Sequence, residues 1–487
     1  MTNKRTQIDT ALLTQENSKR TLKNMDLSKC QIFTPPHIVK YMLDKIDYTS
    51  NVFGKKIIDN SCGTGNILVE VVERFIVDAK KARRKKPTIK KGLEYCIYGY
   101  DVDSDMVEKC INNLNIVAQR FGLTDVQWNI HHQDGLYVEG TFDYVIGNPP
   151  YISYLDLDKE VRAKTKEKFD SCSIGKFDYS YAFIEKGLSS LSANGKMVML
   201  TPSNMFKTVF GDKLRTMIKQ EMTEIIDCST LDMFNGILTS PAITVFQKGS
   251  NSDLLIYRDK YLDGSETEKF IDKNNLIGKW DFSGFVANGN RRFGNYFKVS
   301  NSIATLANNI FIHTIKDDGS MEINVEPTIL RVAKSPKTEQ YGIKQKIIFP
   351  YQYTNGNLVK YEEEDFSRQF PLAYAYLDGQ KEKLKARDSD DKAKWYEYGR
   401  SQALAHLNCE KLLMSTIITR RVRLYRLTAE EIPYSGLYII PTTSMPLDTA
   451  ITILQSQHFY NYLVSKGVKE RGVSIRISSK DVEEFQF

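Results

Sequence analysis

The chain has 487 residues and a mass of 55.9 kDa, which at roughly 150 residues per domain predicts several domains. Hydrophobic residues make up 41% and charged residues 26%, which excludes collagen-like, coiled-coil and wholly disordered chains. The formal net charge of +7 is only weak evidence for a polyanionic partner such as a nucleic acid. The mean hydropathy of -0.39 and the lack of a long apolar run or signal segment favour a cytoplasmic protein with no membrane partner.

The first 30 residues are polar and predict an N-terminal helical arm. From residue 31 to residue 250, short apolar runs alternate with helical patterns, which predicts an α/β domain with a Rossmann-like parallel sheet. Seven strands are expected, at Lys56–Asp59, Ile97–Tyr100, Trp128–His131, Phe142–Ile146, Lys196–Leu200, Glu224–Asp227 and Ala242–Gln247.

The alternation stops after a polar stretch near residue 250. Residues 251–487 are rich in tyrosine and contain one long amphipathic stretch from Phe370 to Arg387. We expect a second, α+β domain there, built as one or two lobes.

A basic tract holds eight Lys or Arg residues between Lys80 and Lys91. A loop that returns from a helix to a parallel strand lies at the amino-terminal edge of the sheet, whereas ligands bind at the carboxyl edge. We therefore expect a solvated insertion in preference to a DNA-binding surface.

Polar residues follow the first three predicted strands. Asp59 precedes a turn that contains Gly63 and Gly65 and opens a helix, a design that lets a ligand approach bare backbone, although any tight turn can use such glycines. Asp101 ends the next strand, where a carboxylate can accept both hydroxyls of a ribose. Asp134 can accept from an adenine amino group or simply form an Asp-Gly turn. Because the full Gly-x-Gly-x-x-Gly pattern is absent, an adenosine cofactor without phosphates, such as S-adenosylmethionine, is favoured over a dinucleotide.

The fourth strand ends in Asn148-Pro149-Pro150-Tyr151. The side-chain oxygen of Asn148 and the carbonyl of Pro149 can draw on the two hydrogens of a conjugated amino group such as adenine N6. This directs the nitrogen lone pair at an electrophilic methyl group. The fixed φ of Pro149 and Pro150 holds the acceptors still, and Tyr151 offers a face on which a base can stack. A rigid extended loop is the structural alternative.

With these motifs in this order, the sequence resembles the gamma class of S-adenosylmethionine-dependent N6-adenine DNA methyltransferases, in the stand-alone restriction-modification form. Further segments that resemble the class are Cys30–Pro36, Gly175–Phe183, Gly195–Pro202 and Met233–Pro241, and, in the second domain, Val299–Ile312 and Ile347–Tyr351.

The resemblance implies roles for individual residues. Asn148, Pro149, Pro150 and Tyr151 would form the catalytic motif, and Phe234 would sandwich the extruded adenine or else be a core residue. For the cofactor, the resemblance implies that Asp59, Gly63 and Gly65 hold the methionine end and Asp101 the ribose. Val102 would pack on the adenine, Asp134 would bind its amino group and Thr34 would lie over the sulfonium.

The second domain would bind double-stranded DNA, because a stacked target base must be rotated out of the duplex and contacts elsewhere must offset that cost. The mixed basic and aromatic residues expected at phosphates and bases are Lys394, Trp395, Arg400, Arg420, Arg421 and Arg423, with solvated helix or strand faces as the alternative. The length available before the cofactor motifs predicts no nuclease in the chain, and a separate endonuclease or defence subunit is a possible partner.

Seven scattered cysteines and six histidines show no metal-ligand spacing, so no metal site is expected. Two other functions fit less well. One is a protein-glutamine or RNA methyltransferase, which faces the same amide or amino chemistry. The other is a DNA-binding module without catalysis, against which the intact Asn148–Tyr151 motif argues.

Overall fold

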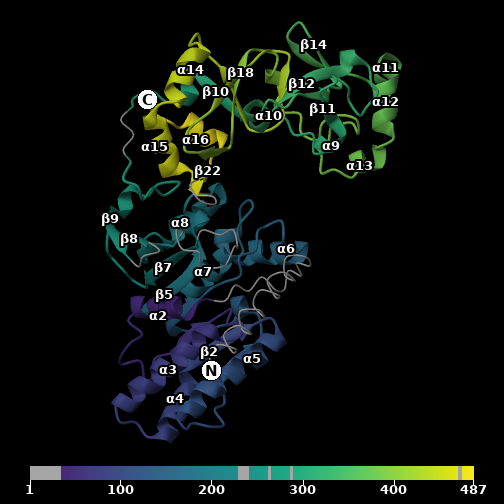
Figure 1. Ribbon diagram of the computed structural model, residues 1–487. Helices are drawn as coiled ribbons and strands as arrows, with labels where there is room; N and C mark the ends of the chain where they lie inside the picture. Colours follow the sequence, from purple (N-terminus) through teal and green to yellow (C-terminus); the bar gives the residue numbers. More distant parts are fainter. Residues whose placement is uncertain (1–33, 229–240, 261–264, 286–288, 470–473) are drawn as a thin grey trace, which may run out of the picture. The chain divides into compact units, whose positions relative to one another are not determined.

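The computed structural model describes residues 34–228, 241–260, 265–285, 289–469 and 474–487, so the predicted N-terminal arm lies outside the described part. The chain forms two compact units, of which the first ends at Trp280 and the second begins at Asp281 (Figure 1). The predicted boundary at residue 250 is therefore too early. None of the described helices combines the length and the apolar character needed to cross a bilayer.

Unit 1 is built on one mixed sheet whose order, within the described residues, is β3-β2-β1-β4-β5-β7-β6-β8-β9. Its strands are β1 Ile57–Asp59, β2 Ile97–Asp101, β3 Asn129–His132, β4 Phe142–Gly147, β5 Leu191–Pro202, β6 Met222–Asp227, β7 Pro241–Gln247, β8 Leu254–Lys260 and β9 Glu266–Asp272.

All seven predicted strands are present, and the α/β class is confirmed. The sheet has two more strands than expected because β8 pairs with β6 and β9 pairs with β8, which carries the sheet past residue 250 and moves the boundary to Trp280. Strand β1 lies between β2 and β4 and runs parallel to both. The chain thus reverses its winding direction at β1 and β4, where the carboxyl ends of open α/β sheets form ligand crevices.

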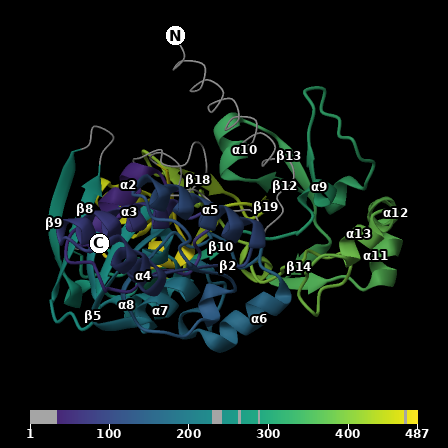
Figure 2. The ribbon, with the colours of Figure 1, turned by 90° about the horizontal axis from the view of Figure 1, so that it is seen from below.

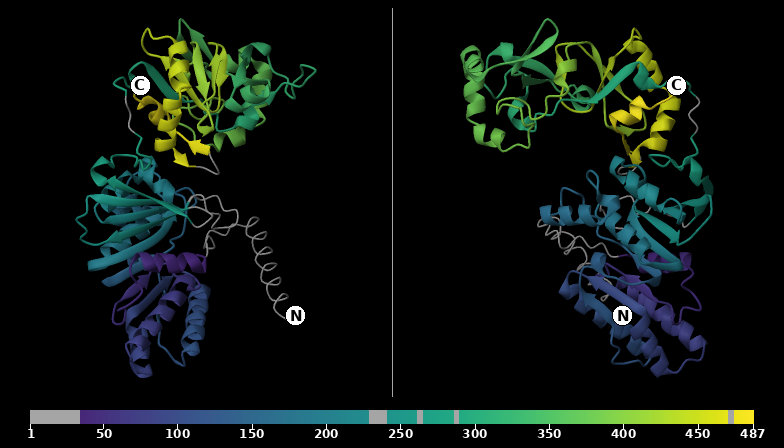
Figure 3. Two further views of the ribbon diagram at one scale, coloured as in Figure 1. Left: turned by 60° about the vertical axis from the view of Figure 1, so that its left-hand side comes forward. Right: turned by 180° about the vertical axis from the view of Figure 1, so that it is seen from behind.

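Helices cover both faces of this sheet, as Figure 3 shows for unit 1. They are α2 Pro36–Lys45, α3 Asn66–Lys81, α4 Lys86–Cys96, α5 Ser104–Arg120, α6 Lys159–Lys168, α7 Ser180–Ser189 and α8 Asp212–Ile218.

Alternating side chains of the strands explain the two covered faces. Ile146 and Val198 share one core with the apolar stripes of α2, α3 and α5. On the opposite face, a Cβ placed on Gly187 of α7 would lie within 3.3 Å of Val145 and 2.4 Å of Met197. Neighbouring residues of β4 and β5 therefore point to opposite sides, and strands buried on both faces are apolar throughout.

The basic tract lies at the end of α3 and the start of α4, two helices that Figure 2 shows in unit 1. The expected irregular insertion is wrong in detail, because Lys86–Cys96 is helical and buries Ile89, Leu93 and Cys96. The charged residues from Lys80 to Lys86 are exposed, as expected for a solvated surface.

Unit 2 contains two four-stranded sheets, β10-β20-β16-β18 and β11-β13-β12-β19, with the smaller β14-β15 and β17-β22-β21. The strands are β10 Phe297–Asn301, β11 Ile312–Thr314, β12 Leu330–Lys334, β13 Gln345–Ile348, β14 Tyr351–Thr354, β15 Asn357–Lys360, β16 Lys411–Met414, β17 Ile417–Thr419, β18 Leu424–Leu427, β19 Glu431–Pro433, β20 Leu437–Pro441, β21 Val468–Lys469 and β22 Ser474–Arg476. The helices are α9 Asn308–Phe311, α10 Pro336–Tyr341, α11 Glu363–Gln369, α12 Pro371–Asp378, α13 Lys381–Lys385, α14 Leu447–Leu454, α15 Gln457–Lys466 and α16 Ser479–Glu483.

The described residues of unit 2 form two hydrophobic cores and therefore two lobes, seen in Figure 3. Strand β20 serves both: Leu437 and Ile439 lie in one core, Tyr438 and Ile440 in the other, as the two-residue period of a strand requires. The amphipathic stretch predicted from Phe370 to Arg387 is divided into α12 and α13.

Candidate functional site

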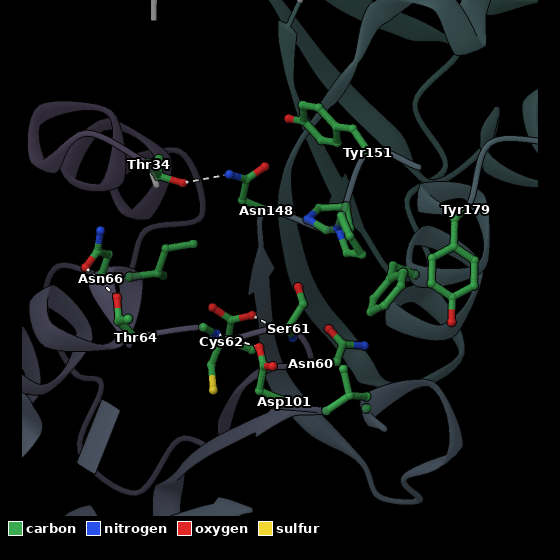
Figure 4. Close-up of a pocket in the computed structure, with 18 of the residues that line it drawn as sticks. Thr34, Asn60, Ser61, Cys62, Thr64, Asn66, Asp101, Asn148, Tyr151 and Tyr179 are labelled. Carbon is green, nitrogen blue, oxygen red and sulfur yellow. Dashed lines mark hydrogen bonds between the residues drawn. The ribbon is translucent and has the colours of Figure 1, made fainter. Parts of the chain in front are cut away.

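A cavity of about 1030 Å³, its mouth included, lies in unit 1 at the carboxyl ends of β1, β2 and β4 (Figure 4). Its lining residues come from segments far apart in the sequence: Thr34, Asp59, Asn60, Ser61, Cys62, Gly63, Thr64, Asn66, Ile67, Asp101, Val102, Asp134, Gly135, Asn148, Pro149, Pro150, Tyr151, Ile152, Tyr179 and Phe183. The fold thus brings the predicted glycine turn, the acidic strand ends and the Asn148–Tyr151 motif to one place.

The glycine turn is held in shape by Asp101. One oxygen of this buried carboxylate accepts the Gly63 N–H at 2.8 Å, and the other accepts the Asp103 N–H at 3.0 Å. An ionised carboxylate has about four acceptor positions, so Asp101 can support the turn and still accept ribose hydroxyls. The Gly63 N–H donates to Asp101, so the predicted contact of the Gly63 backbone with the cofactor would use its other backbone atoms.

Gly65 has a structural reason for being glycine. Its φ is +82°, and a Cβ there would lie 2.6 Å from the sulfur of Cys110 in α5. The residue closes the turn through its N–H to the carbonyl of Cys62 at 2.8 Å, but it is not among the residues that line the cavity. An added side chain would meet α5, and the contact of the Gly65 backbone with the cofactor stays a prediction.

Asp59 is 1% exposed and lies at the end of β1. Burial raises its pKa to about 7, with a smaller contribution from the nearby Asp101 and a partly opposing hydrogen bond from the Ser61 N–H at 3.1 Å. A buried carboxylate without a cation beside it favours a ligand that brings a positive charge.

The side-chain amide of Asn148 donates to the hydroxyl of Thr34 at 3.2 Å. In Figure 4 the amide nitrogen points to Thr34 and the amide oxygen points away from it. Thr34 is buried and lies two residues before the first residue of α2. A residue more than one hundred positions away in sequence thus fixes the orientation of the predicted catalytic amide.

Aromatic side chains form another wall of the cavity. The Tyr151 ring is partly buried against the core, and its hydroxyl has no hydrogen-bond partner among the described residues. Burial, with a smaller effect of Asp178, raises the pKa of Tyr151 far above its usual range, so the ring stays neutral. Tyr179 and Phe183, from the start of α7, form an edge-to-face pair with centroids 5.5 Å apart.

Val102 and Asp134 lie at the mouth of the cavity. Val102 is 68% exposed although it is apolar, so it offers a surface that a flat ring can cover. One oxygen of Asp134 accepts the Leu136 N–H at 2.9 Å at the start of a short 3-10 turn, Gly135–Tyr137, and burial raises the pKa of Asp134. Asp134 therefore forms the predicted turn and also lines the cavity, and its contact with an adenine amino group stays a prediction.

Eleven predicted site residues belong to the described part of unit 1, and all but Gly65 line the cavity. Phe234 lies outside the described residues. The sequence reasoning missed Asn60, Ser61, Tyr179 and Phe183. Asn60 and Ser61 could have been found as the polar pair between Asp59 and the glycine turn. Tyr179 and Phe183 lie in the segment Gly175–Phe183 that resembles the methyltransferase class, but no individual role was assigned to them.

A second concave surface lies in unit 2 and has about 850 Å³ of space. It is lined by Arg420, Arg421, Val422, Arg423, Leu424, Tyr425, Gln455, Ser456, Gln457 and Tyr460, and we call it the arginine groove. Its three arginines are exposed, and none forms an ion pair within the described part of the chain. They lie between β17 and β18, opposite the start of α15.

The other predicted DNA-binding residues have internal partners. Lys394 pairs with Glu362 at 2.8 Å, and Arg400 pairs with Asp390 at 2.7 Å and Asp388 at 3.2 Å. The indole N–H of Trp395 donates to Glu363 at 3.0 Å. These contacts fasten the segment to its own lobe, so the structure separates Lys394, Trp395 and Arg400 from the arginine groove.

Comparisons with known proteins agree with this geometry. Residues 95–234 match the family model described as Eco57I restriction-modification methylase. The type II restriction enzyme and methyltransferase RM.Eco57I of Escherichia coli is 22% identical over 504 residues, which cover 83% of this chain and 50% of that protein. The type II methyltransferase M.BstVI of Geobacillus stearothermophilus is 28% identical over 248 residues, covering 47% of this chain and 44% of that protein. The chain thus spans half or less of the length of these curated relatives.

Solved structures extend the similarity of fold to both units. The structure of the type IIL restriction-modification enzyme MmeI in complex with DNA matches 92% of this chain and 65% of its own, with a TM-score of 0.62 and 13% identity. The structure of a DrdV–DNA complex matches 89% of this chain and 53% of its own, with a TM-score of 0.53 and 12% identity. In sequence the chain is thus similar to the Eco57I restriction-modification methylases over residues 95–234 and to type II methyltransferases, and it shares the methyltransferase fold.

Proposed function

We propose that the protein transfers a methyl group from S-adenosylmethionine to N6 of an adenine rotated out of double-stranded DNA, as part of a restriction-modification or related defence system. The observation that carries the proposal is the position of Asn148–Tyr151 in the same cavity as the glycine turn and the two buried carboxylates Asp59 and Asp101. An amino group held by the motif would face a methyl donor held by the turn.

The residues of the cavity fit the cofactor. Asp59 is buried beside no cation among the described residues and suits the ammonium of the methionine end. Asp101 lines the cavity at the end of β2 and suits the ribose, and the exposed apolar surface of Val102 suits the adenine. When bound, S-adenosylmethionine supplies a methyl group on a positively charged sulfur, which is the electrophile of the reaction.

Asn148 would act on the acceptor base. Its amide oxygen and the carbonyl of Pro149 would accept the two N6 hydrogens, which localises the nitrogen lone pair and aims it at the methyl group. The hydrogen bond from the Asn148 amide nitrogen to Thr34 fixes which way the amide faces. The neutral Tyr151 ring would stack on the base, with a contribution of about 1–3 kcal/mol.

The arginine groove is the part of unit 2 that suits DNA best. Its exposed arginines lack internal ion-pair partners among the described residues, so their charge is available to phosphates or to guanine edges. Contacts of this kind would offset the cost of a few kcal/mol for unstacking the target base. A separate restriction endonuclease remains a proposed partner.

Mapping of methylated adenine in DNA from cells that express the protein tests this function. We expect N6-methyladenine at one short sequence motif with the wild type and with Asn112→Ala, an exposed asparagine of α5 that serves as the matched control. Asn148→Ala should abolish the modification and leave binding of S-adenosylmethionine largely intact. Unmodified DNA with the wild type, or methylation by Asn148→Ala at the wild-type level, would refute the proposal.

A further inference from the structure

Asn60 is a buried polar residue of the cavity to which the catalytic mechanism assigns no role. It follows Asp59 at the end of β1 and is 4% exposed. Its side-chain oxygen is buried and has no hydrogen-bond partner among the described residues. A buried polar group left without a partner costs about 1–3 kcal/mol, so a ligand that supplies the partner would recover this energy.

The surroundings of Asn60 place it beside Asp134. A Cβ on Gly135 would lie 2.2 Å from the Asn60 carbonyl oxygen and 2.6 Å from the Asn60 Cβ, so the Asp134–Gly135 turn packs directly on Asn60. In Figure 4, Asn60 is drawn between Asp101 and Tyr179. It therefore belongs to the part of the cavity in which the proposed function locates the adenosine, next to the carboxylate assigned to the adenine amino group.

The other asparagines that line the cavity have different partners. The oxygen of Asn66 accepts from the Thr64 hydroxyl at 3.2 Å, and the amide of Asn148 donates to Thr34 at 3.2 Å. The carboxylates Asp59, Asp101 and Asp134 accept hydrogen bonds but, when ionised, cannot donate them. Asn60 thus offers an acceptor and a donor in one plane beside Asp134.

We propose that Asn60 binds the N6–N7 edge of the cofactor's adenine, with its oxygen accepting from N6 and its amide nitrogen donating to N7, while Asp134 accepts the second N6 hydrogen. The side-chain amide of asparagine matches this edge of adenine, because its oxygen and nitrogen can pair with N6 and N7 at the same time. The inference rests on the proposed function, because it requires an adenosine cofactor in this cavity. It makes Asn60 a residue that selects the adenine base and leaves the methyl-transfer step to Asn148.

A thermodynamic cycle tests the contact. Affinities of S-adenosylhomocysteine and of its 7-deaza analogue, in which a C–H replaces N7, are measured by titration calorimetry with the full-length protein. We expect the wild type to bind the 7-deaza analogue about tenfold more weakly and Asn60→Ala to bind both about equally, a coupling of about 1.4 kcal/mol. Asn112→Ala, at the exposed asparagine of α5, should keep the tenfold discrimination.

A second variant, Asn60→Asp, separates the loss of this contact from misfolding of Asn60→Ala. At about pH 8.5 the carboxylate of Asn60→Asp accepts but cannot donate, so this variant should lose the discrimination against the 7-deaza analogue. It should still discriminate against an analogue that lacks the N6 amino group. Equal affinity of the wild type for the first two ligands, or retained discrimination in both Asn60 variants, would overturn the inference. If the wild type bound no S-adenosylhomocysteine at all, the proposed function itself would fail.

Discussion

The cavity of unit 1 and the arginine groove of unit 2 present their charges in opposite ways. In the cavity, the carboxylate of Asp101 is buried and already accepts two backbone N–H groups, and Asp59 is almost fully buried. In the groove, Arg421 and Arg423 are exposed, with no ion-pair partner in the described structure. In the proposed function, the first arrangement suits one small molecule and the second suits a large polyanion.

Within unit 2, a second contrast refines this difference. Arg400 is an arginine like those of the groove, but its guanidinium pairs with Asp390 and Asp388. An arginine already paired with carboxylates must give up those contacts before it binds a phosphate. Charge that is visible in a sequence is therefore available for DNA only where the fold leaves it without partners.

The largest effect is expected in the cavity, from Asp101→Ala. The substitution removes the proposed ribose acceptor and also the partner of the Gly63 N–H, so the turn should lose its shape. We expect affinity for S-adenosylmethionine to fall by about 100-fold, or about 2.7 kcal/mol, in titration calorimetry. An unchanged dissociation constant would show that the cofactor does not use this carboxylate.

In the groove, the double variant Arg421→Ala/Arg423→Ala should weaken DNA binding by about 10- to 100-fold and reduce the slope of log affinity against log salt by about 2. Fluorescence anisotropy with a labelled duplex at several salt concentrations measures both quantities. Cofactor affinity should not change. The control is Arg426→Ala, in strand β18, because Arg426 already pairs with Asp448 at 2.8 Å and Glu410 at 3.6 Å. An equal loss in that control would remove the distinction between paired and unpaired arginines.

The raised pKa of Asp59 predicts a pH dependence of cofactor binding. With a pKa of about 7 in the folded protein, Asp59 is mostly protonated below pH 7 and must release its proton to pair with an ammonium group. Affinity for S-adenosylmethionine should rise about tenfold per pH unit between about pH 5 and 7. Calorimetry in buffers of different ionisation enthalpy would detect the proton release, and Asp59→Asn should bind weakly and without this dependence.

For the stability of the ligand-free protein, the raised pKa of Asp59 predicts the opposite pH dependence. A folded-state pKa above the unfolded value means that the folded state holds the proton more tightly, so the Asp59 contribution decreases as pH rises from the usual carboxyl range to about 7. Asp59→Asn should flatten the free energy of unfolding of unit 1 over this range. A slope equal to that of the wild type would show that Asp59 is ionised in the folded state.

The smallest effect is expected for Arg400→Ala. Its ion pairs with Asp388 and Asp390 are on the surface, and such pairs contribute about 0–1 kcal/mol. Denaturant unfolding should show a loss within that range, and DNA affinity should remain at the wild-type value. A DNA-binding defect as large as that of the groove variant would restore Arg400 to the DNA-binding surface and break the comparison.

The sequence by itself determined the seven strands of the α/β sheet and the residues that end β1, β2 and β4. Apolar runs, turn residues and strand-end carboxylates are local signals, and parallel strands align their carboxyl ends whatever the rest of the chain does. For this reason Asp59, Asp101 and Asn148 could be assigned to one cavity before their positions were known. The match of their order to a methyltransferase family completed the assignment.

The tertiary structure alone decided the remaining features. Whether β8 and β9 join the sheet depends on pairing with β6, which leaves no periodic mark in their own residues. The close packing at Gly65 depends on Cys110 of α5, and the burial of Asn60 depends on Gly135. The sorting of basic residues into paired and unpaired ones depends on carboxylates such as Glu362 that are distant in sequence. These properties arise from contacts between segments, so composition and spacing could not predict them.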